Sequence, residues 1–291
     1  MDWELENANY KLQDMITVYE TEIEELKKEK IELKQEVLFL KAQLKYKSLG
    51  NHETETWWGL IMTTQFSKEI KEGTKKSHSA AENTKFVASF LKGVLDPEEY
   101  RKLITNFWYV YETMEERLQE TNDPFVNEIK KWNVLLFRTA FIQRDLRYYY
   151  GPMWREKQIP TEACNKYCYR INEAFNDNPY LLIAHHYTRY IGDLSGGQIL
   201  KGIAKKALNP PEGEGLHFYD FPRIEDAKAF KTEYRSTLDN LDLSREQKDA
   251  LVEEANYAFK LNMDMFNEMK GSATKSLFVL LRNTLFPFLT K

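Results

Sequence analysis

The chain has 291 residues, with 41 lysines and arginines against 45 aspartates and glutamates, and a formal net charge of −4 at pH 7. The lack of a basic excess argues against a nucleic-acid partner. Hydrophobic residues make up 42% of the sequence and aromatic residues 14%, so the chain can build one sizeable core and carry an appendage as well.

The first 46 residues carry a heptad repeat of mainly apolar side chains. Position d of the repeat holds Leu5, Leu12, Tyr19, Leu26, Leu33 and Leu40, and position a holds Asn9, Ile16, Ile23, Lys30, Val37 and Leu44. Leucine at d with β-branched residues at a favours a parallel two-stranded coiled coil. Opposite charges also face each other across the seam, with Glu22, Glu29 and Glu36 at g and Lys27, Lys34 and Lys41 at e. We therefore predict a homodimer joined through residues 5–44; the alternative is a single amphipathic helix packed on its own domain.

Residues 47–62 form a predicted linker, and residues 63–291 a predicted helical domain. Amphipathic stretches of helical period recur at 63–76, 78–92, 97–119, 124–148, 161–175, 179–206, 225–238 and 245–270. Stretches that contain proline, glycine or aspartate separate them, and LHFYDFP at 216–222 is expected to be a short irregular segment. The sequence predicts an all-α fold of about eight helices, preceded by a long coiled-coil helix.

The ends of the chain and its cysteines bear on where the protein works. The N-terminus is acidic and lacks the uninterrupted apolar stretch of a signal peptide or the pattern of a transit peptide. The apolar C-terminal stretch 276–291 is interrupted by Arg282, Asn283 and Pro287, so it falls short of the roughly 20 apolar residues of a transmembrane segment; a weak contact with a membrane surface stays open. Cys164 and Cys168 have no second ligand pair nearby and are expected to be unpaired thiols. We expect the cytoplasm or another reducing, soluble compartment.

The stretch YTRYIGDLSGGQILKG at 187–202 places several glycines inside a predicted helix. Each interior glycine costs a helix about 1 kcal/mol relative to alanine. Gly192 and Gly196 lie on one helical face and leave it bare, which suits close packing of another helix, the commoner cause, or a planar ligand. Asp193 lies at the rim of that face. A carboxylate is costly in a tight helix interface and useful beside a polar cavity, so Asp193 favours the ligand.

A second group of residues matches such a ligand. Lys71, Lys75, His78 and Glu82 form one stripe of a predicted helix, and Lys231 and Arg235 lie four residues apart on another. A lone histidine is usually a surface or core residue, and a lysine–arginine pair is usually a solvated face. A metal ligand beside cations nevertheless suits a flat anionic metal complex, and haem has both a central iron and two carboxylates.

These residues also carry a family resemblance. The segments KEGTKKSHSAAEN and AHHYTRYIGDLSGGQILKGIAKKAL resemble the two defining segments of haem oxygenases. RKLITNFWYVYETMEE, QRDLRYYYG, GEGLHFYDFP, KAFKTEYRSTL and EEANYAFKLNMDMFNE follow in the family's order, so the resemblance covers roughly residues 65–270. EGTKKSHS is closer to the soluble members in cyanobacteria and plastids than to the membrane-tailed animal enzymes. The predicted coiled coil lies outside the family pattern.

The resemblance implies a role for each matching position. His78 matches the proximal ligand of the haem iron, and Glu82 an acidic residue that orients its ring. Gly192 and Gly196 match the distal-helix glycines that lie over the haem, beside Asp193, the aspartate that holds water near the iron-bound oxygen. Tyr111 and Arg189 match the hydrogen-bond network of that aspartate, and Phe259 and Asn262 match residues on the helix that closes the pocket. The polar rim around the propionates is matched by Lys71, Lys75, Tyr187, Lys231 and Arg235.

The implied reaction is the oxygen-dependent cleavage of haem at a meso carbon. Haem b is then both cofactor and substrate, O2 is consumed, no separate metal ion is needed, and the products are biliverdin, carbon monoxide and ferrous iron. The resemblance favours ferredoxin over a flavoprotein reductase as the electron donor.

Two functions of other classes compete with this reaction. One is a haem-binding sensor or carrier on the same fold, and the other is a scaffold in which the domain is vestigial. Retention of His78, Asp193, the glycines and the cations together argues against both. His185 and His186 are the rival iron ligands: His185 matches a position with a structural role, and His186 is expected to face away from haem.

Overall fold

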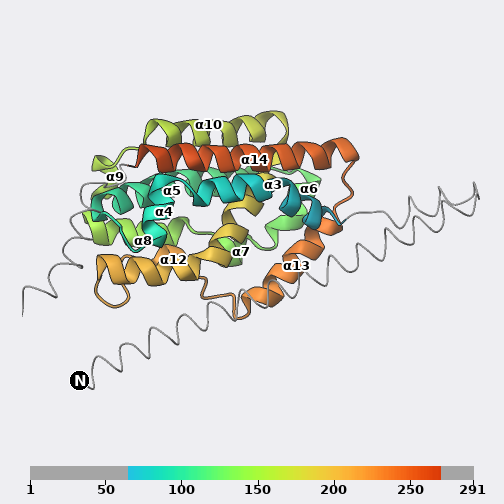
Figure 1. Ribbon diagram of the computed structural model, residues 1–291. Helices are drawn as coiled ribbons and strands as arrows, with labels where there is room; N and C mark the ends of the chain where they lie inside the picture. Colours follow the sequence, from blue (N-terminus) through green and yellow to red (C-terminus); the bar gives the residue numbers. More distant parts are fainter. Residues whose placement is uncertain (1–64, 270–291) are drawn as a thin grey trace, which may run out of the picture. The chain divides into compact units, whose positions relative to one another are not determined.

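The computed structural model describes residues 65–269, and within that range all regular secondary structure is helical (Figure 1). The all-α prediction is confirmed. The helices are α3 (Phe66–Glu82), α4 (Lys85–Leu91), α5 (Pro97–Glu120), α6 (Pro124–Lys130), α7 (Asn133–Leu136), α8 (Thr139–Tyr150), α9 (Trp154–Lys157), α10 (Glu162–Asp177), α11 (Leu182–His186), α12 (Gly192–Leu208), α13 (Ala227–Asp239) and α14 (Arg245–Glu268), with short helical segments η2 (Pro179–Leu181), η3 (Tyr187–Ile191) and η4 (His217–Tyr219). The predicted coiled coil, the linker and the apolar C-terminal stretch lie outside the described residues.

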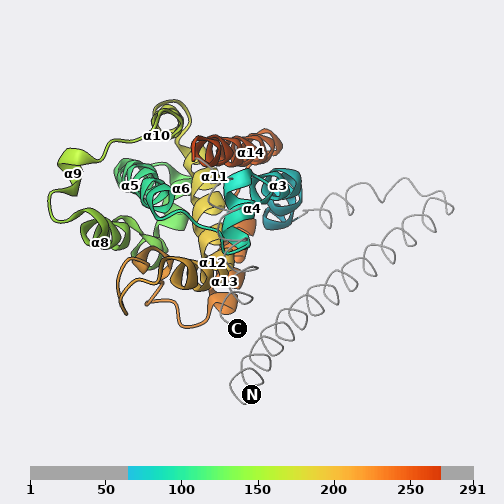
Figure 2. The same cartoon turned by 60° about the vertical axis from the view of Figure 1, so that its left-hand side comes forward.

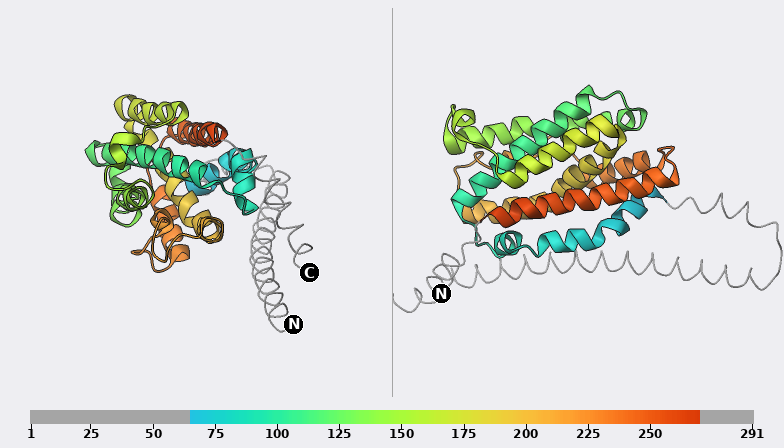
Figure 3. Two further views of the ribbon diagram at one scale, coloured as in Figure 1. Left: turned by 90° about the vertical axis from the view of Figure 1, so that its left-hand side faces the viewer. Right: turned by 90° about the horizontal axis from the view of Figure 1, so that it is seen from above.

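The long helices lie side by side in layers. α14 packs between α3 and α10, and α10 in turn packs on α5, which also contacts α8. α12 and α13 lie on the opposite side of the bundle from α10 and α14, as two turned views show (Figures 2 and 3). Among residues 65–269, no helix combines the length and the apolar character that crossing a membrane requires. This arrangement leaves α3 and α12, the two helices of the predicted site, in different layers.

The core between these layers is rich in aromatic side chains. Fully buried examples come from α5, α9, α10, η3 and α13, namely Tyr100, Tyr111, Trp154, Tyr167, Tyr190 and Tyr234. Such side chains supply large apolar area and carry a hydroxyl or N–H that needs a partner. Several of those hydroxyls take part in the polar network described below.

A side-chain cap marks the start of several helices, including the two longest, α5 and α14. Asp96 accepts a hydrogen bond from the Glu98 amide ahead of α5, and Ser244 starts α14 with a capping box that includes Gln247. α3 has no such cap of its own, because Gln65 makes no side-chain cap bond. Asp239 of α13 replaces it: its carboxylate accepts from the Ser67 amide at 2.8 Å and the Ser67 hydroxyl at 3.1 Å.

α3 runs from Phe66 to Glu82, so it joins the predicted stretch 63–76 to the start of the stretch 78–92, in agreement with the stripe predicted on one helix. Gly73 lowers the intrinsic helix propensity of this stretch. In the structure Gly73 instead permits a close contact, since a Cβ built on it would lie 2.4 Å from Val252 Cγ1 of α14. His78 therefore lies inside a helix, on the same helix as Lys71, Lys75 and Glu82.

The predicted helix 124–148 is divided into α6, α7 and α8. Arg138, at the junction of α7 and α8, is only 1% exposed, and its guanidinium donates to the Leu136 carbonyl at 2.6 Å and to the Asp220 carbonyl. A buried guanidinium needs such acceptors, and the chain bends to provide them. This need does not show in the periodicity of the sequence.

Candidate functional site

The glycines of α12 leave an open face on the helix. A Cβ built on Gly192 or Gly196 would meet nothing within 4 Å, whereas one on Gly197 would lie 3.4 Å from the Tyr219 ring. The bare face is therefore not filled by a neighbouring helix, which was the commoner expectation for this spacing. Space of this kind next to backbone accommodates a flat group.

The helix that carries this face is distorted immediately before it. The predicted single helix 179–206 consists of η2, α11, the π-helical segment η3 and α12. Single π-helical turns are rare and are frequently found at functional sites. The wider turn lies between His186 and Gly192 and contains Arg189, so it sets the direction of the side chains that surround Asp193.

A buried polar network surrounds Asp193. The Tyr111 hydroxyl of α5 donates to Asp193 Oδ2, and Arg189 Nε donates to the Tyr111 hydroxyl at 3.1 Å. Arg189 Nη2 lies 3.5 Å from Asp193 Oδ1, and Nη1 donates to Asn262 Oδ1 of α14. The structure thus brings together four predicted site residues from three separate parts of the chain.

Burial shifts the proton equilibria in this network. It raises the pKa of the Asp193 carboxyl well above its usual value, because the charged form loses its hydration. It also lowers the pKa of the Arg189 guanidinium. The Asp193 side chain is still 14% exposed. A carboxyl with a raised pKa that borders an opening is suited to exchange a proton with a group placed there.

His78 differs from the other histidines on the helices by its exposure. Its side chain is 57% exposed, and its Nδ1 lies 3.7 Å from Glu82 Oε1, which is beyond hydrogen-bond length. The ring packs edge-on against Phe259 of α14, with centroids 5.7 Å apart. An exposed imidazole with an apolar support on one side has a ring nitrogen available to a ligand.

The predicted cations lie on α3 and α13. Lys71 and Lys75 are exposed on α3, and Arg235 is exposed on α13. Lys231 Nζ lies 3.4 Å from the Ser195 hydroxyl of α12, in the turn that carries Asp193 and Gly196. Arg235 also acts on Tyr187: burial raises the pKa of the Tyr187 hydroxyl, and the positive charge of Arg235 partly opposes that rise.

The rival histidines have partners in the interior. His185 Nε2 lies 2.9 Å from Glu254 Oε1, and Arg170 also holds Glu254. His186 Nδ1 lies 2.7 Å from the Tyr234 hydroxyl, and the two rings are stacked. Both histidines are fully buried, and burial lowers the pKa of His186 to about 3. Neither ring has the exposure of His78.

Sequence reasoning missed a second part of the buried network. Glu115, one turn after Tyr111 on α5, accepts from the Tyr190 hydroxyl at 3.1 Å and from the Arg138 amide. Burial raises the pKa of the Glu115 carboxyl. Its position four residues after Tyr111, on the same face of α5, was the one feature of the sequence that could have pointed to it. In YETMEERLQE, however, Glu115 has an acidic neighbour, and nothing in the sequence distinguishes the buried glutamate from the exposed ones.

His217, in the segment 216–222 that the sequence predicts to be irregular, takes part in a second polar arrangement around a buried carboxylate. The buried carboxylate of Asp145 on α8 accepts from the His217 and Phe218 amides, both at 2.8 Å, and lies 2.8 Å from His217 Nδ1. These bonds fix η4. Phe218 then packs against Tyr111, with ring centroids 5.8 Å apart, and so supports the hydroxyl that donates to Asp193.

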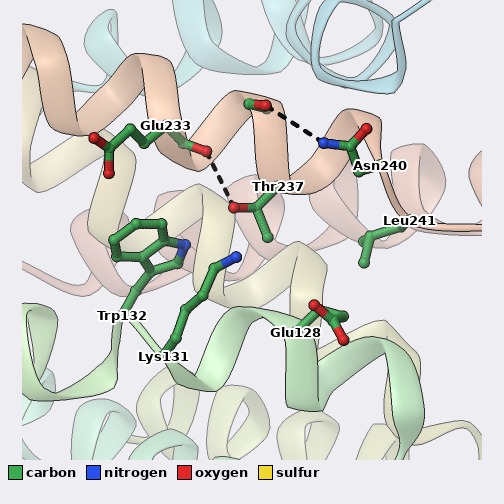
Figure 4. Close-up of a pocket in the computed structure, with 8 residues that line it drawn as sticks. Glu128, Lys131, Trp132, Glu233, Thr237, Asn240 and Leu241 are labelled. Atoms are coloured by element: carbon green, nitrogen blue, oxygen red, sulfur yellow. Dashed lines mark hydrogen bonds between the residues drawn. The ribbon is translucent and has the colours of Figure 1, made fainter.

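A separate pocket of about 380 Å³ lies between α13 and the α6–α7 region (Figure 4). None of the predicted site residues lines it. The lining is Glu128, Lys131, Trp132, Glu233, Ser236, Thr237, Asn240 and Leu241. Its polar groups partly satisfy one another, as in the bond from the Thr237 hydroxyl to the Glu233 carbonyl at 3.0 Å.

Comparison with known proteins gives a consistent result. The family model described as "Heme oxygenase" matches residues 64–268. Heme oxygenase 1 of the cyanobacterium Nostoc is 47% identical over 225 residues, which is 77% of this chain and 94% of the relative. The heme oxygenase of Porphyra purpurea is 46% identical over 231 residues, or 79% of this chain and 97% of the relative.

Solved structures agree with the sequence comparison. The crystal structure of heme oxygenase-1 from Synechocystis in complex with heme is 43% identical, covers 76% of this chain and 100% of its own, and has a TM-score of 0.71. The heme oxygenase structure from Leptospira interrogans is 39% identical, covers 70% of this chain and 100% of its own, and has a TM-score of 0.66. This chain belongs to the haem oxygenase family.

Proposed function

We propose that this chain cleaves haem at a meso carbon, with O2 and external electrons, to biliverdin, carbon monoxide and ferrous iron. The observation that carries the proposal is the open face of α12, where Gly192 and Gly196 have no neighbour and Asp193 borders the opening with a raised pKa. Haem b is the substrate and the cofactor.

The residues present fit haem. His78 is exposed and would hold the iron through one ring nitrogen, while its Nδ1 lies 3.7 Å from Glu82 Oε1, one turn further along α3. The bare helix would accept the flat macrocycle. Two carboxylates at the edge of haem match cations from α3 and α13, which are Lys71, Lys75, Lys231 and Arg235, together with the Tyr187 hydroxyl.

The protein's chemical contribution lies mainly in the Asp193 network. Bound haem supplies the iron at which O2 is activated. Asp193, whose pKa burial raises, would exchange protons with water at the opening, while Tyr111 and Arg189 fix its orientation. The Arg189 guanidinium is itself occupied by Asn262 and Tyr111. Proton delivery through water is gentler than direct donation from a cation, so the ring remains the target of oxidation.

The test is spectroscopic. Haem and a reducing system are added to the purified protein, and the Soret band is followed. Loss of the band with growth of the biliverdin spectrum is expected. A Soret band that persists with every reductant tried would refute the enzyme and favour the sensor or carrier. Asp193→Ala is expected to retain haem and to lose biliverdin yield, because the proton-holding carboxyl is gone; an unchanged yield contradicts its role.

The electron donor and the compartment are part of the proposal. We expect a ferredoxin-type donor, on the basis of the resemblance to the soluble cyanobacterial and plastid members. Reduced ferredoxin should support faster turnover than a flavoprotein reductase at equal concentration, and the reverse order would overturn this choice. A reducing compartment is in keeping with Cys164 and Cys168, which are both free thiols.

The proposal includes a homodimer formed through residues 5–44. The supporting pattern is the heptad repeat with complementary charges at its flanks. Deletion of residues 1–46 is expected to leave a monomer with unchanged haem affinity, because the family resemblance begins near residue 65. Sedimentation that shows an unchanged dimer after the deletion would contradict the coiled-coil prediction.

A further inference from the structure

α14 contacts α3 through directional hydrogen bonds just before His78. Asn256 of α14 donates from Nδ2 to the Gly73 carbonyl at 3.0 Å and accepts at Oδ1 from the Ser77 hydroxyl at 2.5 Å. The same amide nitrogen donates to the Val252 carbonyl of its own helix at 2.9 Å. One side chain thereby satisfies two polar groups of α3 that lie one turn apart.

A close approach of the two helices accompanies these bonds. Gly73 lies so near α14 that a Cβ on it would come within 2.4 Å of Val252 Cγ1. Any side chain at this position would require the Val252 side chain or one of the two helices to shift. Val252 and Asn256 are one turn apart on α14, and they meet Gly73 and Ser77, which are one turn apart on α3. The two helices are therefore matched over a full turn.

This match fixes how α3 is rotated about its own axis. A helix held at one point can still roll, whereas two contacts a turn apart, one of them a pair of directional bonds, prevent it. His78 follows Ser77 directly, so the roll angle sets the direction of its Cα–Cβ bond. Phe259, almost one turn after Asn256, then supports the His78 ring from the side.

We propose that Asn256 is a positioning residue that, with the Gly73–Val252 contact, sets the direction of the His78 ring. The inference rests on the proposed function for what that ring binds, but the contact belongs to the protein without haem and is testable there. A purely structural role for Asn256 would affect only the stability of the fold.

The first experiment compares Asn256→Ala with a matched control, Asn172→Ala. Asn172 donates to the Cys168 carbonyl at 3.0 Å and accepts from Arg117 Nε of α5 at 2.7 Å, so its loss also removes cross-helix bonding, but away from α3. The ring resonances of His78 are recorded in haem-free protein by two-dimensional ¹H–¹³C spectroscopy and identified by their loss in His78→Gln. They report the edge-on contact with Phe259.

We expect the His78 resonances to move in Asn256→Ala and to stay in place in Asn172→Ala, while both variants unfold at lower urea concentrations than the parent. A folded Asn256→Ala protein with unmoved His78 resonances would overturn the inference. Should Asn256→Ala not fold, Ser77→Ala removes one bond only and should move the same resonances by less. Unmoved resonances in that variant would also count against the proposal.

A second pair of variants tests the close approach. Gly73→Ala should displace α3 and shift the His78 resonances, and the added Val252→Ala change in the double variant should restore them, because the blocking methyl group is removed. Resonances that stay at the parent position in Gly73→Ala, or that the double variant leaves displaced, would contradict the proposal.

Haem-loaded protein then separates this inference from the proposed function. Asn256→Ala should bind haem about three- to tenfold more weakly, which corresponds to about one net hydrogen bond, with a shifted iron–histidine stretching band in the reduced state. If the parent degrades haem but the His78 resonances never respond, the positioning role fails alone. If the His78 resonances move in Asn256→Ala but the parent protein does not bind haem, the proposed function fails alone.

Discussion

Alanine at Gly192 or Gly196 should have opposite effects on the fold and on haem binding. In the free protein each new methyl group would point into open space, so nothing opposes the gain in helix propensity of about 1 kcal/mol. For a domain of this size, that gain corresponds to a rise in Tm of about 2–4 °C. In haem-bound protein the same methyl group would occupy the space against which the macrocycle packs.

The size of the binding effect follows from the packing. An added methyl group in a filled site costs about 1–3 kcal/mol, which is about a five- to 150-fold loss of haem affinity. Gly202→Ala is the matched control. It lies on α12, and its Cβ would also meet nothing within 4 Å, but it is on another face of the helix. It should stabilise the fold equally and leave haem affinity unchanged.

Two measurements on the same preparations decide the outcome: thermal unfolding of the haem-free protein and titration of the Soret band. Haem affinities of Gly192→Ala and Gly196→Ala that equal that of Gly202→Ala would refute the assignment of the bare face to haem. A drop in Tm would show instead that another side chain fills the space, and would refute the reading of the open face itself.

Three further predictions concern ionisable groups in the interior. Burial raises the pKa of Asp193 in the folded state above its value of about 4 in the unfolded chain. The parent protein should therefore lose stability as the pH rises from about 4 through the folded-state pKa. In urea unfolding at several pH values, Asp193→Asn should not show this loss. Burial lowers the pKa of His186 to about 3, so stability should fall by up to about 5 kcal/mol as pH falls from about 6.5 to about 3; His186→Asn should flatten that acid limb, and an unchanged limb would contradict the shift. Burial alone would raise the pKa of Glu254, but bonds from His185 and Arg170 bring it to about 2. Glu254→Gln should therefore cost about 3–5 kcal/mol in urea unfolding at pH 7, and a loss below about 1 kcal/mol would show that the cluster is dispensable.

The sequence predicted the helices well where each one satisfies its own rules. α5 begins at a proline preceded by the capping residue Asp96, and α14 begins at a capping box, close to the predicted bounds. The predicted helix bounds were wrong, or a cap was missed, where residues far away in the sequence determine how a helix begins or ends. The stretch 124–148 is divided around buried Arg138, whose guanidinium donates to the distant Asp220 carbonyl, and α3 takes its N-terminal cap from Asp239 of α13. These causes lie far away in the sequence, so local patterns cannot report them.

The site shows the same division between local and distant causes. The stripe on α3 and the bare face on α12 follow from helical spacing, because each belongs to one helix. The bond from Tyr111 to Asp193 spans 82 positions, and only the family resemblance indicated it. Glu115 and Asp145 were missed because the sequence does not distinguish a buried carboxylate from an exposed one unless its distant partners are known.

The position of the cations relative to His78 is also set by a distant contact. Asp239, at the end of α13, provides the missing N-terminal cap of α3 through two bonds to Ser67. The helix that carries Lys231 and Arg235 is thereby tied to the helix that carries His78. A ligand held at both its centre and its edge needs a fixed distance between the two holding points. In the proposed complex, the bonds from Ser67 to Asp239 would help to hold α13 against α3 before haem binds, so less of the binding energy of the propionates would be spent on ordering α13.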